Sequence, residues 1–205
     1  MKRLAFCAAG VCLSLVVGAQ SRYETLIRVN PWNSGVNAAG MRQDSTAFSN
    51  AEAGGVYHSG DFRSRSDAAT EWAASAQART LTQLEKFSMR GAFSFEDREA
   101  YDACGSMMMD SGKFPVDVLE FTPGRKTYQT YNMYGALSVD VAPQWRVGAG
   151  LDFTSRNAAK LKDLRYTGYA LDMQVAPSVM YCDGDFAAGV SAIYKRNTET
   201  VSAEQ

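Results

Sequence analysis

The fold is decided by residues 128–157, which read YQTYNMYGALSVDVAPQWRVGAGLDFTSRN. Apolar and polar residues alternate on both sides of a turn at residues 142–144. Because successive side chains of a β-strand point to opposite faces, this period of two places the apolar residues together. The apolar residues are Tyr131, Met133, Leu137, Val139, Val141, Trp145, Val147, Ala149, Leu151 and Phe153. The pattern predicts two long antiparallel strands.

The same stretch predicts the register of these two strands. A shift of one residue would move every side chain to the other face, so the two apolar faces restrict the possible turns. A three-residue turn at 142–144 satisfies this restriction. It pairs Val141 with Trp145 and Asp140 with Arg146.

The length of the alternating runs favours a membrane-spanning barrel. Strands of soluble proteins have about 5 to 6 residues, whereas about 9 to 11 are needed to cross a bilayer at a tilt. Trp145 lies at the turn end of the apolar face, and Tyr131 and Phe153 lie near its other end. Two such groups of aromatic residues are typical of outer-membrane barrels. We therefore expect an all-β, antiparallel, up-and-down transmembrane β-barrel, with a secreted β-sandwich as the alternative.

Residues 1–19 have the pattern of a cleaved signal peptide. Lys2 and Arg3 precede an apolar run, and small residues at 17–19 precede Gln20. A lipoprotein signal at Cys12 is disfavoured because Cys12 lies within the apolar run. No other stretch approaches the roughly 18 apolar residues of a membrane helix, so a membrane protein with this sequence has to be a barrel. We expect export to the outer membrane.

Residues 51–205 predict about seven barrel strands. They lie near residues 54–63, 71–81, 87–96, 128–141, 145–157, 169–181 and 186–195. Asp183 and Gly184 predict a type I′ turn that places Met173 opposite Tyr194. Because bacterial barrels have an even number of strands, we expect these strands to be the N-terminal part of a larger barrel.

Two segments lack strand periodicity. Residues 20–50 are rich in turn formers, and we interpret them as a hatch in the barrel mouth or as a flexible periplasmic leader. Residues 97–127 are expected to form a long outer loop, since such barrels have short periplasmic turns and long outer loops. Cys104 in this loop and Cys182 at a periplasmic turn would lie about a membrane thickness apart, so we predict no disulfide between them.

Charged residues of both signs occur on the predicted polar faces. Mixed signs favour a wall of internal ion pairs over an ion-selective ladder of one sign. These pairs would line a solute path or simply stabilise the wall. The candidate lumen-facing residues are Arg79, Arg90, Glu96, Asp140, Arg146, Asp152, Asp172 and Lys195.

Other functional classes have little support. His58 is the only histidine, and its neighbour Ser59 would point to the opposite face of a strand. The sequence has no phosphate-binding loop and no paired-cysteine metal motif, and consecutive methionines at 107–109 do not converge on a metal. A net charge of -1 argues against nucleic acid. We expect no enzyme, no catalytic residue, no cofactor and no metal. The expected partners are outer-membrane lipid and a small-molecule solute.

Three features resemble known barrels. They are the signal ending in Ala19-Gln20, the element Asn37-Ala38-Ala39-Gly40, and serial hairpins such as KFSMRGAFSFEDR at 86–98. Together they resemble uncharacterised outer-membrane β-barrel proteins of Bacteroides-type bacteria. They are distantly similar to the fatty-acid-transporter class, whose leader carries Asn-Pro-Ala-Gly where this sequence has Ala38. The resemblance implies a porin-like or lipophilic-solute transport barrel, with a structural or adhesive barrel presenting surface loops as the alternative.

Overall fold

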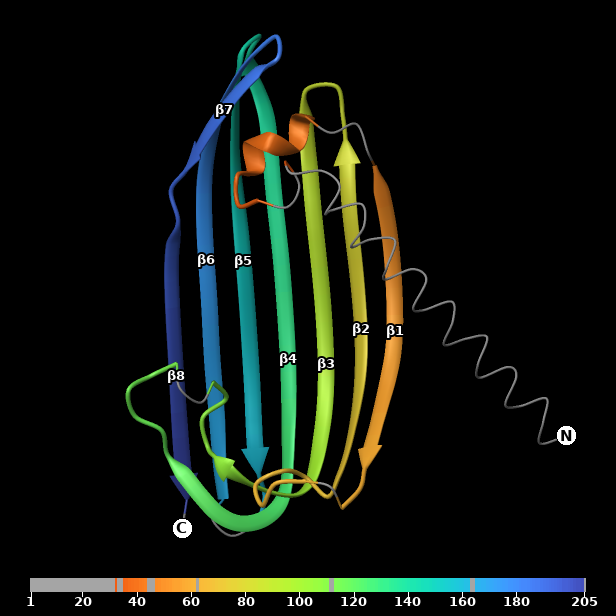
Figure 1. Ribbon diagram of the computed structural model, residues 1–205, viewed down its shortest axis with the longest axis vertical. Helices are drawn as coiled ribbons and strands as arrows, with labels where there is room; N and C mark the ends of the chain where they lie inside the picture. The colour runs from red at the N-terminus through yellow and green to blue at the C-terminus, as the bar shows by residue number, and fades with distance from the viewer. Residues whose placement is uncertain are drawn as a thin grey trace, which may run out of the picture.

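The structure is a computed structural model that describes residues 32, 35–43, 47–61, 63–110, 113–162 and 165–204. Its described strands form one antiparallel sheet in up-and-down order (Figure 1), so the all-β prediction is confirmed. The strands are β1 (Phe48–Ser59), β2 (Thr70–Gln83), β3 (Phe87–Ser106), β4 (Leu119–Ala142), β5 (Trp145–Lys160), β6 (Arg165–Asp183), β7 (Phe186–Ser191) and β8 (Tyr194–Glu204). A short 3-10 helix, η1 (Ala38–Gln43), precedes them.

The described sheet has eight strands in seven positions, because its last strand is interrupted. Both β7 and β8 pair with β6, and the register continues unchanged from Ser178↔Ser191 to Val175↔Tyr194. Only residues 192–193 separate them. The two therefore occupy one position beside β6, and the described strands leave the sheet open between β1 and this position.

The predicted register of the central hairpin is confirmed along its length. Asp140 pairs with Arg146, and the same register extends to Lys126 and Lys160. The turn itself differs, because a bulge places Ala142, and not Val141, opposite Trp145. The extra residue of the bulge leaves the faces of both strands unchanged below it.

The predicted register of the next hairpin is wrong by two residues. Asp183 pairs with Phe186, so the turn is Gly184-Asp185 and Met173 lies opposite Arg196. Gly184 has a φ of 57°, and Asp185 is not among the described residues with positive φ. Positive φ at the first turn position alone is the type II′ pattern, which prefers glycine there. The shift of two preserves the faces predicted for both strands.

The expected outer loop at 97–127 is wrong in extent. β3 continues to Ser106 and β4 begins at Leu119, so most of this segment is paired. The register shifts twice, between Ala100 and Ala103 and between Ala103 and Gly105. Bulges of this kind break the period of two and bend a strand. The alternation in the sequence therefore did not reveal that β3 and β4 continue into this segment.

The two faces of the sheet differ in character. We call the face that η1 contacts the inner face and the opposite one the outer face; η1 contacts β3, β4, β5 and β6. The outer face carries large apolar side chains that are exposed to solvent. They include Met89, Phe93, Met133, Leu137, Val141, Trp145, Val147, Leu151, Tyr169, Leu171, Phe186, Val190 and Tyr194. Buried apolar residues gather on the inner face, in a small cluster around Met41 and Leu81.

The two ends of the sheet also differ. Short turns at 84–86, 143–144 and 184–185 lie at one end, here called the turn end, together with η1 (Figure 1). The described residues at the other end, the loop end, are 60–61, 63–69, 107–110, 113–118 and 161–162. The predicted signal peptide at 1–19 lies outside the described residues. Of the predicted 20–50 segment the structure describes residues 32, 35–43 and 47–50, which include η1 and the start of β1. β1 begins at Phe48 and not at residue 51. The described residues include no helix that is long and apolar enough to span a membrane.

Candidate functional site

The candidate site is the inner face, and all eight charged residues named from the sequence lie on it. Residues that pair across neighbouring antiparallel strands share a face, as Asp140 and Arg146 do. The eight are Arg79 on β2, Arg90 and Glu96 on β3, Asp140 on β4, Arg146 and Asp152 on β5, Asp172 on β6 and Lys195 on β8. They do not form one cluster, because they are spread over the whole length of the sheet.

η1 is built into the inner face at the turn end by small side chains. The backbone N–H of Ala39 donates to Ser178 Oγ at 3.1 Å, and Ser138 Oγ donates to the Ala39 carbonyl at 3.2 Å. Gly148 lies beneath them, where an added Cβ would come within 2.5 Å of the Ala39 nitrogen. A side chain at residue 148 would therefore displace η1. The Ala39 N–H also donates to Asn37 Oδ1 at 3.0 Å. Asn37, the residue before η1, is thereby held at the same site.

Arg42 joins η1 to two of the predicted charged residues. Its guanidinium pairs with Asp140, which also pairs with Arg146 at 3.2 Å. Arg42 also donates to the carbonyl of Leu84 in the turn between β2 and β3, at 2.6 Å. Asp140 on the inner face therefore has a structural role, which is to hold η1 through its ion pair with Arg42.

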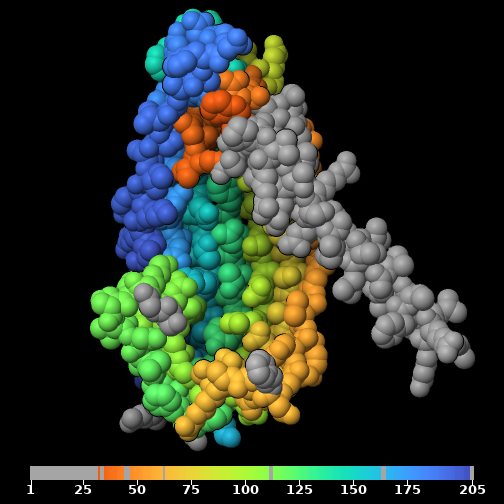
Figure 2. All heavy atoms as spheres, in the orientation of Figure 1, coloured from red at the N-terminus to blue at the C-terminus, as the bar shows by residue number. Residues whose placement is uncertain are grey.

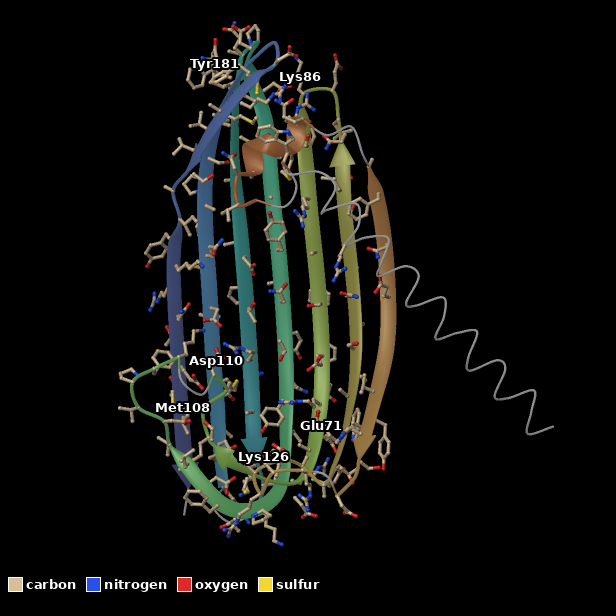
Figure 3. All side chains as sticks on the ribbon, in the orientation of Figure 1. Glu71, Lys86, Met108, Asp110, Lys126 and Tyr181 are labelled. Atoms are coloured by element: carbon tan, nitrogen blue, oxygen red, sulfur yellow. The ribbon has the colours of Figure 1, made fainter. Side chains whose placement is uncertain are left out.

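The loop end is covered by the end of the β3–β4 hairpin. We call residues 101–110 and 113–124 the hairpin end. It bends across the inner face (Figure 1). Asp110 and Lys126 both lie in the lower half of Figure 3, whereas Lys86 and Tyr181 lie at its upper end. Between η1 and the hairpin end the surface is hollowed over β4 and β5 (Figure 2).

A buried ionic cluster fastens the hairpin end. Lys126 and Lys160 are each 1% exposed, and Glu120 is 5% exposed. Lys126 Nζ lies 3.0 Å from Glu120 Oε1, and Lys160 Nζ donates to Glu120 Oε2 at 2.5 Å. Lys160 also donates to the Thr122 carbonyl, and Lys126 lies 5.7 Å from the centre of the Tyr166 ring. We call these three charged residues the Lys–Glu–Lys cluster.

A second, half-buried group of ion pairs lies nearer the hairpin tip. Arg156 on β5 donates two hydrogen bonds to Asp110, each 2.5 Å, and a further one to Asp172. Lys113 donates to Asp172 at 2.6 Å and to Asp110 at 3.0 Å. The bonds from Arg156 are the main reason that the pKa of Asp110 is lowered to about 2. Asp172, one of the predicted residues, is thus brought into contact with the hairpin end.

A cavity of about 380 Å³ lies beneath the hairpin end. Its walls come from β3, β4 and β5, from the segment that links β1 to β2, and from the hairpin end itself. Its lining includes Glu96, Arg98, Cys104, Lys126, Tyr128 and Arg156. Arg98 stacks on Tyr128, with 4.2 Å between the guanidinium carbon and the ring centre. The cavity is therefore lined by charges of both signs, and Glu96 is the predicted residue that reaches it.

The remaining predicted residues lie between the two ends. Asp152 accepts a hydrogen bond from Asn132 at 3.1 Å, and Arg79 donates to Gln77 at 2.5 Å. Arg90 lies 5.1 Å above the Tyr134 ring. Lys195 on β8 pairs with Gln174 on β6. These residues give the middle of the inner face a polar, hydrogen-bonded surface.

Glu120, Lys126 and Lys160 were missed by the sequence reasoning. A signal for the lysines was present, because the register of the central hairpin, extended to its far end, places Lys126 opposite Lys160. Glu120 gave no such signal, since it reaches the lysines only through the bend of the hairpin. The predicted absence of a disulfide is confirmed, because Cys104 and Cys182 are both free. Among the described residues no group of three or more His, Cys, Asp or Glu side chains could hold a metal ion.

Residues 38–204 match the sequence pattern of one protein family, described as Family of unknown function (DUF6850). The chain belongs to this family. The match begins at the first residue of η1 and ends at the last residue of β8, so η1 is part of the family pattern together with the sheet. Searches of curated proteins and of solved structures found no match.

Proposed function

We propose that this chain forms the wall of an outer-membrane β-barrel that passes small or lipophilic solutes, with η1 and the hairpin end narrowing the path at its two ends. The observation that carries the proposal is the contrast between the faces. The outer face is apolar and exposed, whereas the inner face is polar and partly covered.

The outer face supports contact with lipid. Trp145, Tyr181 and Phe186 lie near each other at the turn end, with 5.2 Å between the first two ring centres. Phe95 and Tyr131 contact each other farther down, with ring centres 4.9 Å apart. Trp145 and Phe153 are separated by a length of β5 of about 26 Å, at about 3.3 Å per residue. Outer-membrane barrels carry a lipid-facing band of about 25 Å between two aromatic girdles.

The inner face supports a solute path that is restricted at both ends. Small residues and hydrogen-bonded polar side chains line its middle, and Figure 2 shows that this part is hollowed. η1 narrows the turn end and the hairpin end narrows the loop end. By the usual orientation of bacterial barrels, short turns face the periplasm and long loops face outward.

The open sheet supports a larger assembly. β1 and β8 run in the same direction (Figure 1), so they cannot pair with each other in an antiparallel ladder. Unpaired edges are not tolerated in lipid. We infer that an odd number of further strands completes the barrel, in line with the resemblance to larger outer-membrane barrels.

A structural or adhesive barrel is the second candidate. It is favoured by the hydrogen bonds that hold η1 and by the buried Lys–Glu–Lys cluster, since both could seal the interior permanently. In that case the segments at the loop end would bind a partner at the cell surface.

Cell fractionation and solute flux test the proposal. The protein is expected in the outer-membrane fraction, and liposomes that contain the completed barrel, with the further strands inferred above, are expected to release small encapsulated solutes. Membrane insertion with a sealed interior would favour the structural barrel. A protein found only in the soluble secreted fraction would contradict both, and would favour the β-sandwich.

A further inference from the structure

We propose that the hairpin end is a movable lid over the polar cavity, hinged at the bulges of β3 and held closed by Glu120. The proposal rests on the proposed function, because it assigns the regulation of the same solute path. It concerns the described residues 101–110 and 113–124 and their contacts with the inner face.

The hinge is visible in the backbone. Between Ala100 and Gly105 the register of β3 against β4 shifts twice, so regular pairing is interrupted where the hairpin bends. Asp102 has a φ of 56°, and it is the only non-glycine residue with positive φ in the described part of the chain. Such a backbone conformation is uncommon outside glycine and persists where the surrounding structure imposes it. A bulged strand can bend here without breaking the long ladder below.

Glu120 is the residue on which closure depends. Lys126 and Lys160 lie opposite each other on the wall, and Glu120 is the carboxylate of the hairpin end that reaches both. Two buried like charges opposite each other repel, and removal of the shared partner of a buried charge is strongly destabilising. With the hairpin end open, both lysines would regain water. The free energy of closure therefore depends most strongly on the carboxylate of Glu120.

The ion pairs of Asp110 and Lys113 also stabilise the closed hairpin end, but they contribute less than the Lys–Glu–Lys cluster. Asp110 and Lys113 flank the tip and pair with Arg156 and Asp172 of the wall. These side chains are 18–30% exposed, so water and salt screen them more than the Lys–Glu–Lys cluster. Their loss is expected to loosen the tip without releasing the whole hairpin end.

Cys104 reports on the position of the lid. It lies within the hinge segment between Ala100 and Gly105, lines the cavity and is 8% exposed. Its thiol donates to the Arg65 carbonyl at 3.3 Å, and its N–H donates to the Ser66 carbonyl at 3.2 Å. Cys182 at the turn end is half-buried and accepts a hydrogen bond from Gln43. Opening of the lid would expose Cys104 and leave Cys182 unchanged, whereas global unfolding would expose both.

The test is the rate of maleimide modification of the full chain in detergent micelles, with peptide mass spectrometry to assign the label. In the unaltered protein Cys104 is expected to react more slowly than Cys182. Glu120→Gln is expected to increase the rate of Cys104 modification by about tenfold or more, and Asp110→Asn is expected to increase it by a smaller factor. Glu85→Gln is the matched control, because Glu85 is exposed in a turn at the other end.

Two results would overturn the proposal. One is Cys104 reacting as fast as Cys182 in the unaltered protein. The other is a Cys104 rate within about twofold of the unaltered value in both Glu120→Gln and Asp110→Asn. If Glu120→Gln exposes both cysteines, the protein has unfolded, and Asp110→Asn with its intact cluster then decides the matter. Flux in liposomes is measured separately, so a lid without flux would contradict the transport proposal alone.

Discussion

Lys126 and Lys160 lie directly opposite each other on β4 and β5, both almost fully buried, and they share the carboxylate of Glu120. The cluster thus holds two positive charges and one negative charge. Buried charges are costly unless they are paired, so the two lysines differ from the glutamate in what their removal should do.

Removal of one lysine should lower the free energy of unfolding less than removal of the glutamate does. Lys160→Met leaves Lys126 paired with Glu120 and balances the charges, so we expect a loss of less than about 1 kcal/mol in the free energy of unfolding. Glu120→Gln leaves both lysines without a carboxylate and is expected to cost about 3 to 5 kcal/mol. Urea unfolding of both variants in detergent checks this. Equal costs would show that the net charge of the cluster is unimportant.

A glycine at residue 148 should be required for η1 to pack against β5. In Gly148→Ala the new Cβ would meet the backbone of Ala38 and Ala39, which cannot move aside as a flexible side chain could. We expect displacement of η1, a loss of about 1 to 3 kcal/mol, and faster cleavage by trypsin after Arg42.

Gly150→Ala is the control for this variant. It lies two residues along the same face of β5, and its added Cβ would find its nearest neighbours at 3.8 Å and 4.0 Å. We expect cleavage after Arg42 to stay as in the unaltered protein. Faster cleavage in both variants would attribute the effect to β5 as a whole and not to the contact with η1.

The closed hairpin end should loosen in acid. The pKa of Asp110 is lowered to about 2 from an ordinary 3.8, chiefly by hydrogen bonds from Arg156. A lowered pKa means that the ionised carboxylate stabilises the closed state above about pH 4, and that this contribution is lost as the pH falls toward 2. Pepsin cleavage within 101–124, normalised to a reference substrate, should rise over this range.

Asp110→Asn should remove most of that acid dependence. Its hairpin end is expected to be cleaved faster already at pH 4, with a smaller further rise toward pH 2. An unchanged acid profile in this variant would mean that another group is responsible.

The outer face should tolerate charge in water but not in lipid. Leu137 is 45% exposed on β4, roughly midway between the two aromatic groups. In a bilayer Leu137→Arg is expected to cost about 2 to 4 kcal/mol, whereas Val141→Arg, near the turn end of the same strand, should cost about 0 to 1 kcal/mol. Folding into liposomes measured for both variants checks the difference. A similar small cost for both would favour a soluble sheet.

The sequence by itself determined the fold class, the faces of the strands and the register of the central hairpin. This is so because side chains alternate with a period of two, and a slip of one residue would expose an entire apolar face. The register at Gly184 differs from the predicted one because a shift of two residues preserves the faces of both strands, so that only the turn conformation decides between the two registers.

Only the tertiary structure decided how the ends of the sheet are covered. Bulges between Ala100 and Gly105 conceal the end of β3 from a period of two and bend the hairpin. Glu120 meets Lys126 and Lys160 through that bend, and Arg42 meets Asp140 through the placement of η1. These contacts join residues from different elements, and no periodic pattern in the sequence relates the two partners. They depend on where the folded backbone returns, which alternation along a single strand does not encode.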